Sequence, residues 1–529
     1  MCPIDSENQP AAKTEHSVIG RILAGDIPIN TSIALIGAPG TGTSIMATQV
    51  VVNSLRRGKK VSLVLYDYAP KLADKYFRFF GFDPAPFKAS GKLRVLDGYD
   101  LLRQAMGISS FTDIVDMRPI EFDELSKVFQ VGLMSKILEN QSEPTTIVID
   151  SFTAISPFID ARAAYEMNAE GFVRMRSGKH SSLIVAHEGV LESNFTQVLT
   201  RFVDGVVRLR VERTAKGLAR ELLIEKMRFT NLTTPLMDFM ISNDGISLLV
   251  GGRPLVKESS GDSSSLSVSG CEKPLLPRFE RIATGIPELD RALLGGFPRG
   301  TSICVEGDVG TGTSTFCTQF VWSTLLAGGI AFYVCVDGPP SDVIEQFQSL
   351  GWDAGPYIDR NSLILSDAYS LFRSSRRESL KGAKESGAAR KLIGDFIKAE
   401  REKFSEKTQA GTPVVAAIDS FTTIAPYLDL KTAYVLARFT ADMARTNDQT
   451  YLTVVRSGTV EANLLHAFLG NADGILNLEN AWTKARAGSS GPRRLIRKMR
   501  VEKMAFTPIP PKALEYEITS RGLILSKFK

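Results

Sequence analysis

Short runs of apolar and β-branched residues alternate along the chain with longer stretches whose apolar positions recur at helical spacing. The runs at 32–37, 61–66, 146–150 and 182–186 predict four buried strands, and those at 301–307, 331–336, 414–419 and 450–455 predict four more. Strands covered by helices on both faces have this almost continuous apolar character. The pattern therefore predicts an α/β fold with mostly parallel sheets flanked by helices.

The sequence contains an internal repeat of two copies. GAPGTGTS at 37–44 returns as GDVGTGTS at 307–314, and IDSFT from 149 returns from 418. EKMRFT from 225 returns as EKMAFT from 502, and this larger offset indicates an eight-residue insertion between Gly474 and Lys503. A Ser/Gly-rich connector, KESSGDSSSLSVSG, separates the copies. We expect a flexible N-terminus at 1–17, domains at 18–250 and 279–529, and a linker at 251–278.

Composition narrows the function classes only slightly. The 529 residues carry 63 Lys and Arg against 58 Asp and Glu, a balance too even to predict a nucleic-acid or membrane partner. The five cysteines form no CxxC pair, and no stretch approaches the roughly 20 apolar residues of a membrane span. The N-terminus is polar and lacks the apolar segment of a secretion signal, so we expect a cytoplasmic protein.

In each copy a predicted strand runs into a glycine-rich turn and then a helix, the setting of a phosphate-binding loop. The glycines let successive backbone N–H groups point inward, and the helix adds its positive N-terminal end. A serine follows in the position whose hydroxyl reaches Mg²⁺. The candidate nucleotide-binding residues are Gly37, Gly40, Thr41, Gly42, Thr43 and Ser44 in the first copy and Gly307, Gly310, Thr311, Gly312, Thr313 and Ser314 in the second.

Both loops lack the lysine that normally precedes this serine, since Thr43 and Thr313 occupy its position. A charge-assisted hydrogen bond contributes roughly 1.5–3 kcal/mol, so its loss weakens nucleotide binding by about 10- to 150-fold. Backbone amides can still hold a phosphate. A second element is an aspartate that ends an apolar strand, Asp150 and Asp419, which suits a carboxylate that holds the water shell of Mg²⁺.

With these motifs the chain resembles the KaiC family of tandem RecA-type P-loop ATPases. The resemblance rests on TGIPELDRALLGGFPRG, GTGTSTFCTQF, GWD, IDSFT, the DG pairs and EKM(R/A)F, and spans roughly 18–246 and 282–523. It implies a hexameric double ring with ATP and Mg²⁺ at subunit interfaces. Where the family has two adjacent glutamates, this chain has Asp67-Tyr68 and Asp337-Gly338, so Asp67 and Asp337 are the candidate catalytic carboxylates.

The resemblance also implies a Lys-x-Arg that reaches a neighbouring subunit's phosphates. Lys226 and Arg228 match it in the first copy, whereas the second keeps Lys503 but has Ala505. One hypothesis is that Lys226 and Arg228 partly compensate for Thr43. His187, which follows the predicted strand at 182–186, is interpreted as structural.

The resulting prediction is an oligomeric regulatory or signalling protein that binds ATP or ADP with Mg²⁺ and hydrolyses it slowly or not at all. The alternatives are an active ATPase with unconventional groups and a RecA-like nucleic-acid-binding ATPase. The nucleic-acid alternative rests on the basic segment 484–503, which contains eight Lys or Arg and one Glu. This segment favours a solvated hairpin or a pore lining over a nucleic-acid site. The sequence does not identify a regulatory partner.

Overall fold

The structure is a computed structural model that describes most of the chain between residues 18 and 526. The residues outside the description within that span are 69, 99, 102–133, 140–142, 159–160, 189–192, 215–216, 229–235, 243–244, 251–252, 255–279, 372, 374–393, 397, 401, 404–410, 429, 459, 483–494, 508 and 511. The expected flexible N-terminus, most of the expected linker and residues 484–494 of the basic segment therefore lie outside the described residues.

The first domain is built on a ten-stranded sheet in the order β10-β9-β8-β7-β6-β1-β5-β4-β2-β3. The six strands from β6 to β3 run parallel, and β6 to β10 form an antiparallel extension. The strands are β1 Ser32–Gly37, β2 Lys60–Leu65, β3 Leu93–Asp97, β4 Thr145–Asp150, β5 Ser181–His187, β6 Gly205–Thr214, β7 Gly217–Met227, β8 Leu236–Ser242, β9 Gly245–Val250 and β10 Arg253–Pro254.

The second domain repeats this plan with nine strands in the order β15-β14-β16-β17-β13-β18-β19-β20-β21. Its strands are β13 Ser302–Gly307, β14 Ile330–Cys335, β15 Leu363–Asp367, β16 Val414–Asp419, β17 Thr450–Arg456, β18 Gly474–Trp482, β19 Leu495–Met504, β20 Leu514–Thr519 and β21 Gly522–Leu525. A separate two-stranded ribbon pairs β11 Arg281–Ile282 with β12 Phe297–Pro298. The predicted fold class, two tandem α/β domains with mostly parallel sheets, is confirmed.

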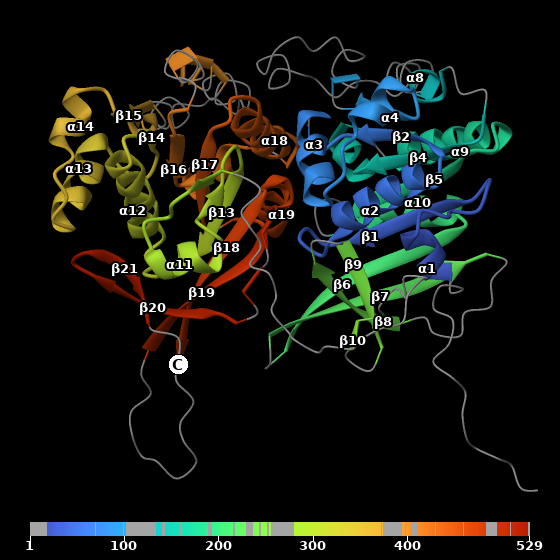
Figure 1. Ribbon diagram of the computed structural model, residues 1–529. Helices are drawn as coiled ribbons and strands as arrows, with labels where there is room; N and C mark the ends of the chain where they lie inside the picture. The colour runs from blue at the N-terminus through green and yellow to red at the C-terminus, as the bar shows by residue number, and fades with distance from the viewer. Residues whose placement is uncertain are drawn as a thin grey trace, which may run out of the picture.

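Helices cover both faces of the parallel part of each sheet (Figure 1). In the first domain they are α1 Val18–Leu23, α2 Thr43–Arg56, α3 Pro70–Phe79, α4 Ala85–Ala89, α8 Met134–Leu138, the 3₁₀ helix η3 Phe152–Phe158, α9 Ala161–Ser177 and α10 Ser193–Phe202. In the second they are α11 Pro287–Ala292, α12 Thr313–Leu326, α13 Pro340–Ser349, α14 Gly355–Asp359, α17 Phe421–Ile424, η4 Ala425–Tyr427, α18 Leu430–Thr446 and α19 Ala462–Asn471. No helix in the described part of the chain is long and apolar enough to cross a bilayer.

One duplicated polar contact explains the paired Asp-Gly motifs. Asp204 accepts a hydrogen bond from the backbone N–H of Ser32 at 3.0 Å, and Asp473 accepts one from Ser302 at the same distance. Asp204 thereby joins the start of β1 to β6, and Asp473 joins the start of β13 to β18. This contact fixes β1 and β13, and hence the loops at their carboxyl ends.

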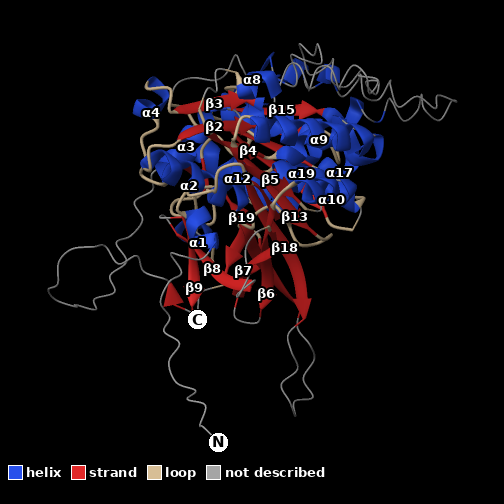
Figure 2. Cartoon of the chain, turned by 90° about the vertical axis from the view of Figure 1, so that its right-hand side faces the viewer, coloured by secondary structure: helices blue, strands red, loops and turns tan. Residues whose placement is uncertain are grey.

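The two domains lie side by side in a similar orientation, with both antiparallel extensions at the bottom of the view (Figure 1), and Figure 2 shows the extensions below the helical layers from the side. Helix α18 of the second domain packs on the first, because Tyr434 and Val435 join the hydrophobic cluster that contains Tyr66 and Phe152. Phe506 packs on a second cluster of the first domain, with its ring 4.9 Å from that of Tyr76. The interface thus has an apolar base, and it borders the first phosphate loop.

Candidate nucleotide sites

Both glycine-rich loops have the backbone conformation of a phosphate cradle. Gly40 and Gly42 have φ of 87° and 107°, and Gly310 and Gly312 have φ of 82° and 87°, values that L side chains rarely adopt. A threonine hydroxyl closes each loop on itself: Thr41 donates to the Ala38 carbonyl at 2.8 Å, and Thr311 donates to Asp308 at 2.6 Å. The loops lead into α2 and α12, so the positive helix ends face the loops.

The threonines at the lysine position are buried, with 3% exposure for Thr43 and 6% for Thr313. Thr43 Oγ1 lies 3.3 Å from His187 Nε2, and the other ring nitrogen of His187 lies 3.7 Å from Asp67. Burial lowers the pKa of His187, and the nearby Asp67 opposes this shift. The histidine interpreted as structural therefore lies inside the first site, between Thr43 and Asp67.

A different basic group approaches each loop from its own domain. Arg220 of β7 donates to the Gly40 carbonyl at 3.3 Å, and its counterpart Arg497 of β19 donates to the Gly310 carbonyl at 3.2 Å. Both positions lie in the antiparallel extension, far along the sequence from the loops. Each loop thus has a guanidinium beside it although neither has the usual lysine.

The first strand-end aspartate lies where the sequence predicts. Ser44 Oγ donates to Asp150 Oδ1 at 3.3 Å, and the hydroxyl of Tyr68 donates to Asp150 Oδ2 at 2.9 Å. Burial, followed by the charge of Asp67, raises the pKa of Asp150 to about 7. A carboxylate with this pKa is half protonated near neutral pH, and a bound cation would favour its charged form.

The second aspartate has a similar environment. Asp419 is 7% exposed, burial raises its pKa, and the neighbouring Ser314 hydroxyl opposes that rise. Tyr333 donates to Asp419 Oδ2 at 2.9 Å, whereas the buried Oδ1 has no hydrogen-bond partner among the described residues. An unpartnered carboxylate oxygen next to a serine hydroxyl fits a hydrated Mg²⁺, which prefers oxygen ligands and keeps several waters.

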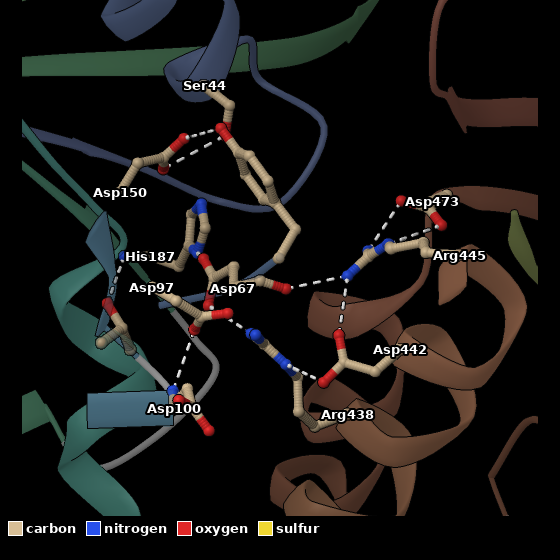
Figure 3. A network of polar contacts seen from close by, with 12 residues as sticks. Ser44, Asp67, Asp97, Asp100, Asp150, His187, Arg438, Asp442, Arg445 and Asp473 are labelled. Atoms are coloured by element: carbon tan, nitrogen blue, oxygen red, sulfur yellow. Dashed lines mark hydrogen bonds and ion pairs between the residues drawn. The ribbon is translucent and has the colours of Figure 1, made fainter. Parts of the chain in front are cut away.

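The two candidate catalytic carboxylates have different partners. Asp337 forms an ion pair with Arg456 at 2.5 Å and accepts hydrogen bonds from Ser420 and Thr423. Asp67 instead lies 3.8 Å from Arg438 of the second domain (Figure 3). Asp337 is therefore held by its own domain, whereas Asp67 lies at the boundary between domains.

Lys503 is at the first loop although it belongs to the second domain. A Cβ built on Gly40 would lie 3.4 Å from Lys503 Cβ, and the Lys503 amine donates to the Ala472 carbonyl at 2.6 Å. Burial lowers the pKa of Lys503, while Asp473, Asp67 and Asp150 act to raise it. Since Asp67 and Asp150 belong to the first site, their charges and that of Lys503 interact across the domain boundary.

The arginine Arg445 connects the domains next to this lysine. It donates to the backbone carbonyl of Asp67 at 2.9 Å and to Asp473 at 2.8 Å, and Figure 3 shows it between the two domains. The motif residues Lys226 and Arg228 contact their own domain: Lys226 donates to Thr200 and Val203 carbonyls, and Arg228 donates to Asp204. Within one chain, the first loop thus receives Lys503 and not Lys226 or Arg228.

A family model described as "ATPase: KaiC" matches residues 13–252 and 282–528, so the chain belongs to the KaiC ATPase family. Among curated relatives, a UPF0273 protein of Thermotoga maritima is 28% identical over 236 residues, which cover 44% of this chain and 93% of the relative. The circadian clock protein KaiC2 of Synechocystis is 31% identical over 180 residues, 34% of this chain and 28% of the relative.

Proposed function

We propose that this protein binds ATP or ADP with Mg²⁺ in both cradles and acts as an oligomeric regulatory or signalling protein with slow or lost hydrolysis. One observation carries the proposal. In both sites the loop glycines and the serine–aspartate pair are present, while the lysine and one residue of the acidic pair are replaced. The loop glycines and the serine–aspartate pairs have suitable positions, whereas Thr43 and Thr313 replace the lysines.

The second acidic position supports the loss of catalysis. Tyr68 stands there in the first copy and donates to Asp150, so its side chain is an additional hydrogen-bond donor and not a base. Gly338 stands there in the second copy and has no side chain. With one residue of the acidic pair missing from each site, a bound nucleotide would be cleaved slowly or not at all. Such a protein would use the nucleotide mainly to stabilise one conformation or assembly.

Calorimetric titration of the full-length protein with Mg·ATP and Mg·ADP, together with a phosphate-release assay, tests the proposal. We expect binding to two sites per chain, an increase in thermal stability and a very low rate of phosphate release. Ser44→Ala and Ser314→Ala, alone and together, should remove the Mg²⁺-dependent part of binding one site at a time. Absence of heat and of thermal protection at saturating nucleotide would overturn the proposal.

A second candidate function, a residual ATPase confined to the first site, is favoured by the proximity of Lys503 to Asp67 and Asp150. If that activity exists, Asp67→Asn should abolish phosphate release and Asp337→Asn should leave it unchanged. The nucleic-acid alternative has less support, because Arg497 of the basic segment contacts the Gly310 carbonyl of the loop.

A further inference from the structure

In each copy the strand beside the phosphate loop ends in a basic residue. His187 ends β5 and pairs with Gly37, the first glycine of the first loop. Arg456 ends β17 and pairs in the same way with Gly307 in the second loop. Both residues have the same anchor, because the backbone N–H of each donates to a threonine hydroxyl, at 2.6 Å in the first copy and 2.7 Å in the second. The fold therefore places a basic side chain next to both loops.

The threonine at the lysine position lies close to this strand end. A Cβ built on Gly37 would lie 3.2 Å from the methyl group of Thr43, and the hydroxyl of Thr43 lies 3.3 Å from Nε2 of His187. In the second copy, a Cβ built on Gly307 would lie 2.9 Å from the methyl group of Thr313. Threonine is short and uncharged, so on this side of the loop the strand-end residue can supply the positive charge that a lysine would supply.

A carboxylate lies beside each basic side chain. Nδ1 of His187 lies 3.7 Å from Asp67 (Figure 3). Arg456 forms its ion pair with Asp337, and its side chain is 35% exposed. An imidazolium has two N–H donors and a guanidinium has five. A carboxylate that holds one nitrogen of either group therefore leaves another nitrogen for a phosphate oxygen.

The surroundings of His187 determine its charge. Among the described residues, the groups that contact or face it are two threonines and two charged residues: Thr43 of α2, Thr153 of η3, Asp67 after β2 and Lys503 of β19. Asp67 in turn interacts with Arg438 of α18 and Asp150 of β4. Burial lowers the pKa of His187, Asp67 acts to raise it, and Lys503 acts to lower it. A phosphate beside Nε2 would add negative charge and favour the protonated ring, whereas arginine stays charged in proteins.

We propose that His187 and Arg456 bind the phosphates of the nucleotide in place of the two missing loop lysines, His187 as an imidazolium and Arg456 as a guanidinium. The inference rests on the proposed nucleotide binding and identifies the residues that supply positive charge to it. It gives the histidine that was interpreted as structural a contact with the ligand. It also makes the two sites differ, because the first gains its charge only as the pH falls, while the second has a permanent charge.

Calorimetric titration with Mg·ATP at pH 6 and pH 8 tests the first site in full-length chains that carry Ser314→Ala. His187→Arg should bind about tenfold more tightly than the parent chain at pH 8 and about equally at pH 6, since the histidine is protonated only at the lower pH. His187→Gln should bind about 10- to 150-fold more weakly than His187→Arg at both pH values. Comparing variants at one pH cancels effects common to all chains, such as protonation of Asp150.

The reciprocal exchange tests the second site in chains that carry Ser44→Ala. Arg456→His should make affinity there fall between pH 6 and pH 8 relative to the parent chain, and Arg456→Gln should lower it at both pH values. The matched control is His466→Gln, which replaces a half-buried histidine of α19 and should leave both affinities unchanged. Thermal unfolding without nucleotide checks that each variant is folded.

Histidine-ring NMR of the wild type gives a readout that needs no functional variant. The chain has four histidines, and comparison with His187→Gln assigns the signal. Saturating Mg·ATP should raise the measured pKa of His187 by about one pH unit, which corresponds to tenfold tighter binding by the protonated ring. If nucleotide binds but leaves this pKa unchanged, or if His187→Gln and Arg456→Gln bind as their parent chains do, the inference is wrong and the proposed function stands. A wild type that binds no nucleotide would overturn both.

Discussion

The two phosphate sites share one backbone design but differ in what surrounds it. Both have a cradle, a serine beside a buried aspartate, a tyrosine hydroxyl on that aspartate and an arginine on a loop carbonyl. The first site is covered by the second domain and has Lys503 beside it, whereas no described residue beyond its chain neighbours lies within 4 Å of a Cβ built on Gly310 in the second loop. The comparison separates what the fold supplies to every copy from what a neighbouring domain adds.

The tyrosines show that similar environments can arise from different positions. Tyr68 follows β2, at the second position of the missing acidic pair, while Tyr333 lies within β14. The residue that matches Tyr333 in the first copy is Leu63. Both hydroxyls nevertheless donate to the strand-end aspartate at 2.9 Å. The shared requirement is a donor for a buried carboxyl group, since leaving that group without a partner is costly.

The largest expected effect comes from adding a side chain to the first glycine of a phosphate loop. A Cβ on Gly37 would lie 2.8 Å from the backbone carbonyl of Leu209, and one on Gly307 would lie 2.9 Å from that of Leu478. Because backbone must move, each alanine should destabilise its domain by about 2–4 kcal/mol. Gly37→Ala should abolish nucleotide binding at the first site alone, and Gly307→Ala at the second alone. Loss of a single site in each titration checks this, and loss of both sites from one substitution would contradict the independence of the cradles.

The next largest effect concerns stability and pH. The pKa of Asp150 is about 7 in the folded protein against 3.8 for the ordinary group, so the folded state binds the proton more tightly. Stability from this group is full below pH 3.8 and falls as the pH rises to about 7, by up to about 4 kcal/mol. Asp150→Asn should remove this fall, so the variant should gain stability over the wild type as the pH rises from 5 to 8.

Scanning calorimetry of the protein without nucleotide across this pH range measures the difference, with the exposed Asp359→Asn as a control. Saturating Mg·ATP should reduce the gap between the wild type and Asp150→Asn, since a bound cation offsets the buried charge. Parallel stability curves for the wild type and Asp150→Asn would contradict the raised pKa.

Removing the lysine at the domain boundary should separate the two sites. Lys503→Ala removes the charge that interacts with Asp67 and Asp150, so affinity at the first site should fall by about 10- to 150-fold while the second site keeps its affinity. The matched control is Lys226→Ala. It loses an equivalent hydrogen bond to a backbone carbonyl but lies far from the first loop. Equal losses at the first site from both substitutions would indicate that Lys503 acts only through the fold.

The sequence predicts the fold and the loops because local features determine them. Glycines at fixed spacing, apolar strand runs and the duplicated motifs are read along the chain, and the structure has the α/β sheets they predict. The partners of the site could not be predicted in this way. Arg220 and Arg445 reach it through strand pairing and domain packing, which bring together residues far apart in sequence. The one available signal was the paired position of Arg220 and Arg497 in the two copies.

The smallest expected effect tests whether those arginines act alike. Arg220→Ala and Arg497→Ala each remove one hydrogen bond to a loop carbonyl, worth about 1 kcal/mol, so affinity should fall about fivefold at the affected site. Equilibrium titration with a fluorescent ATP analogue measures both variants. Because each arginine belongs to the same domain as its loop, the two losses should be similar. A loss for Arg220→Ala without one for Arg497→Ala would mean that the guanidinium matters only where Lys503 also covers the loop, and the two sites would then differ within their own domains as well as in their neighbours.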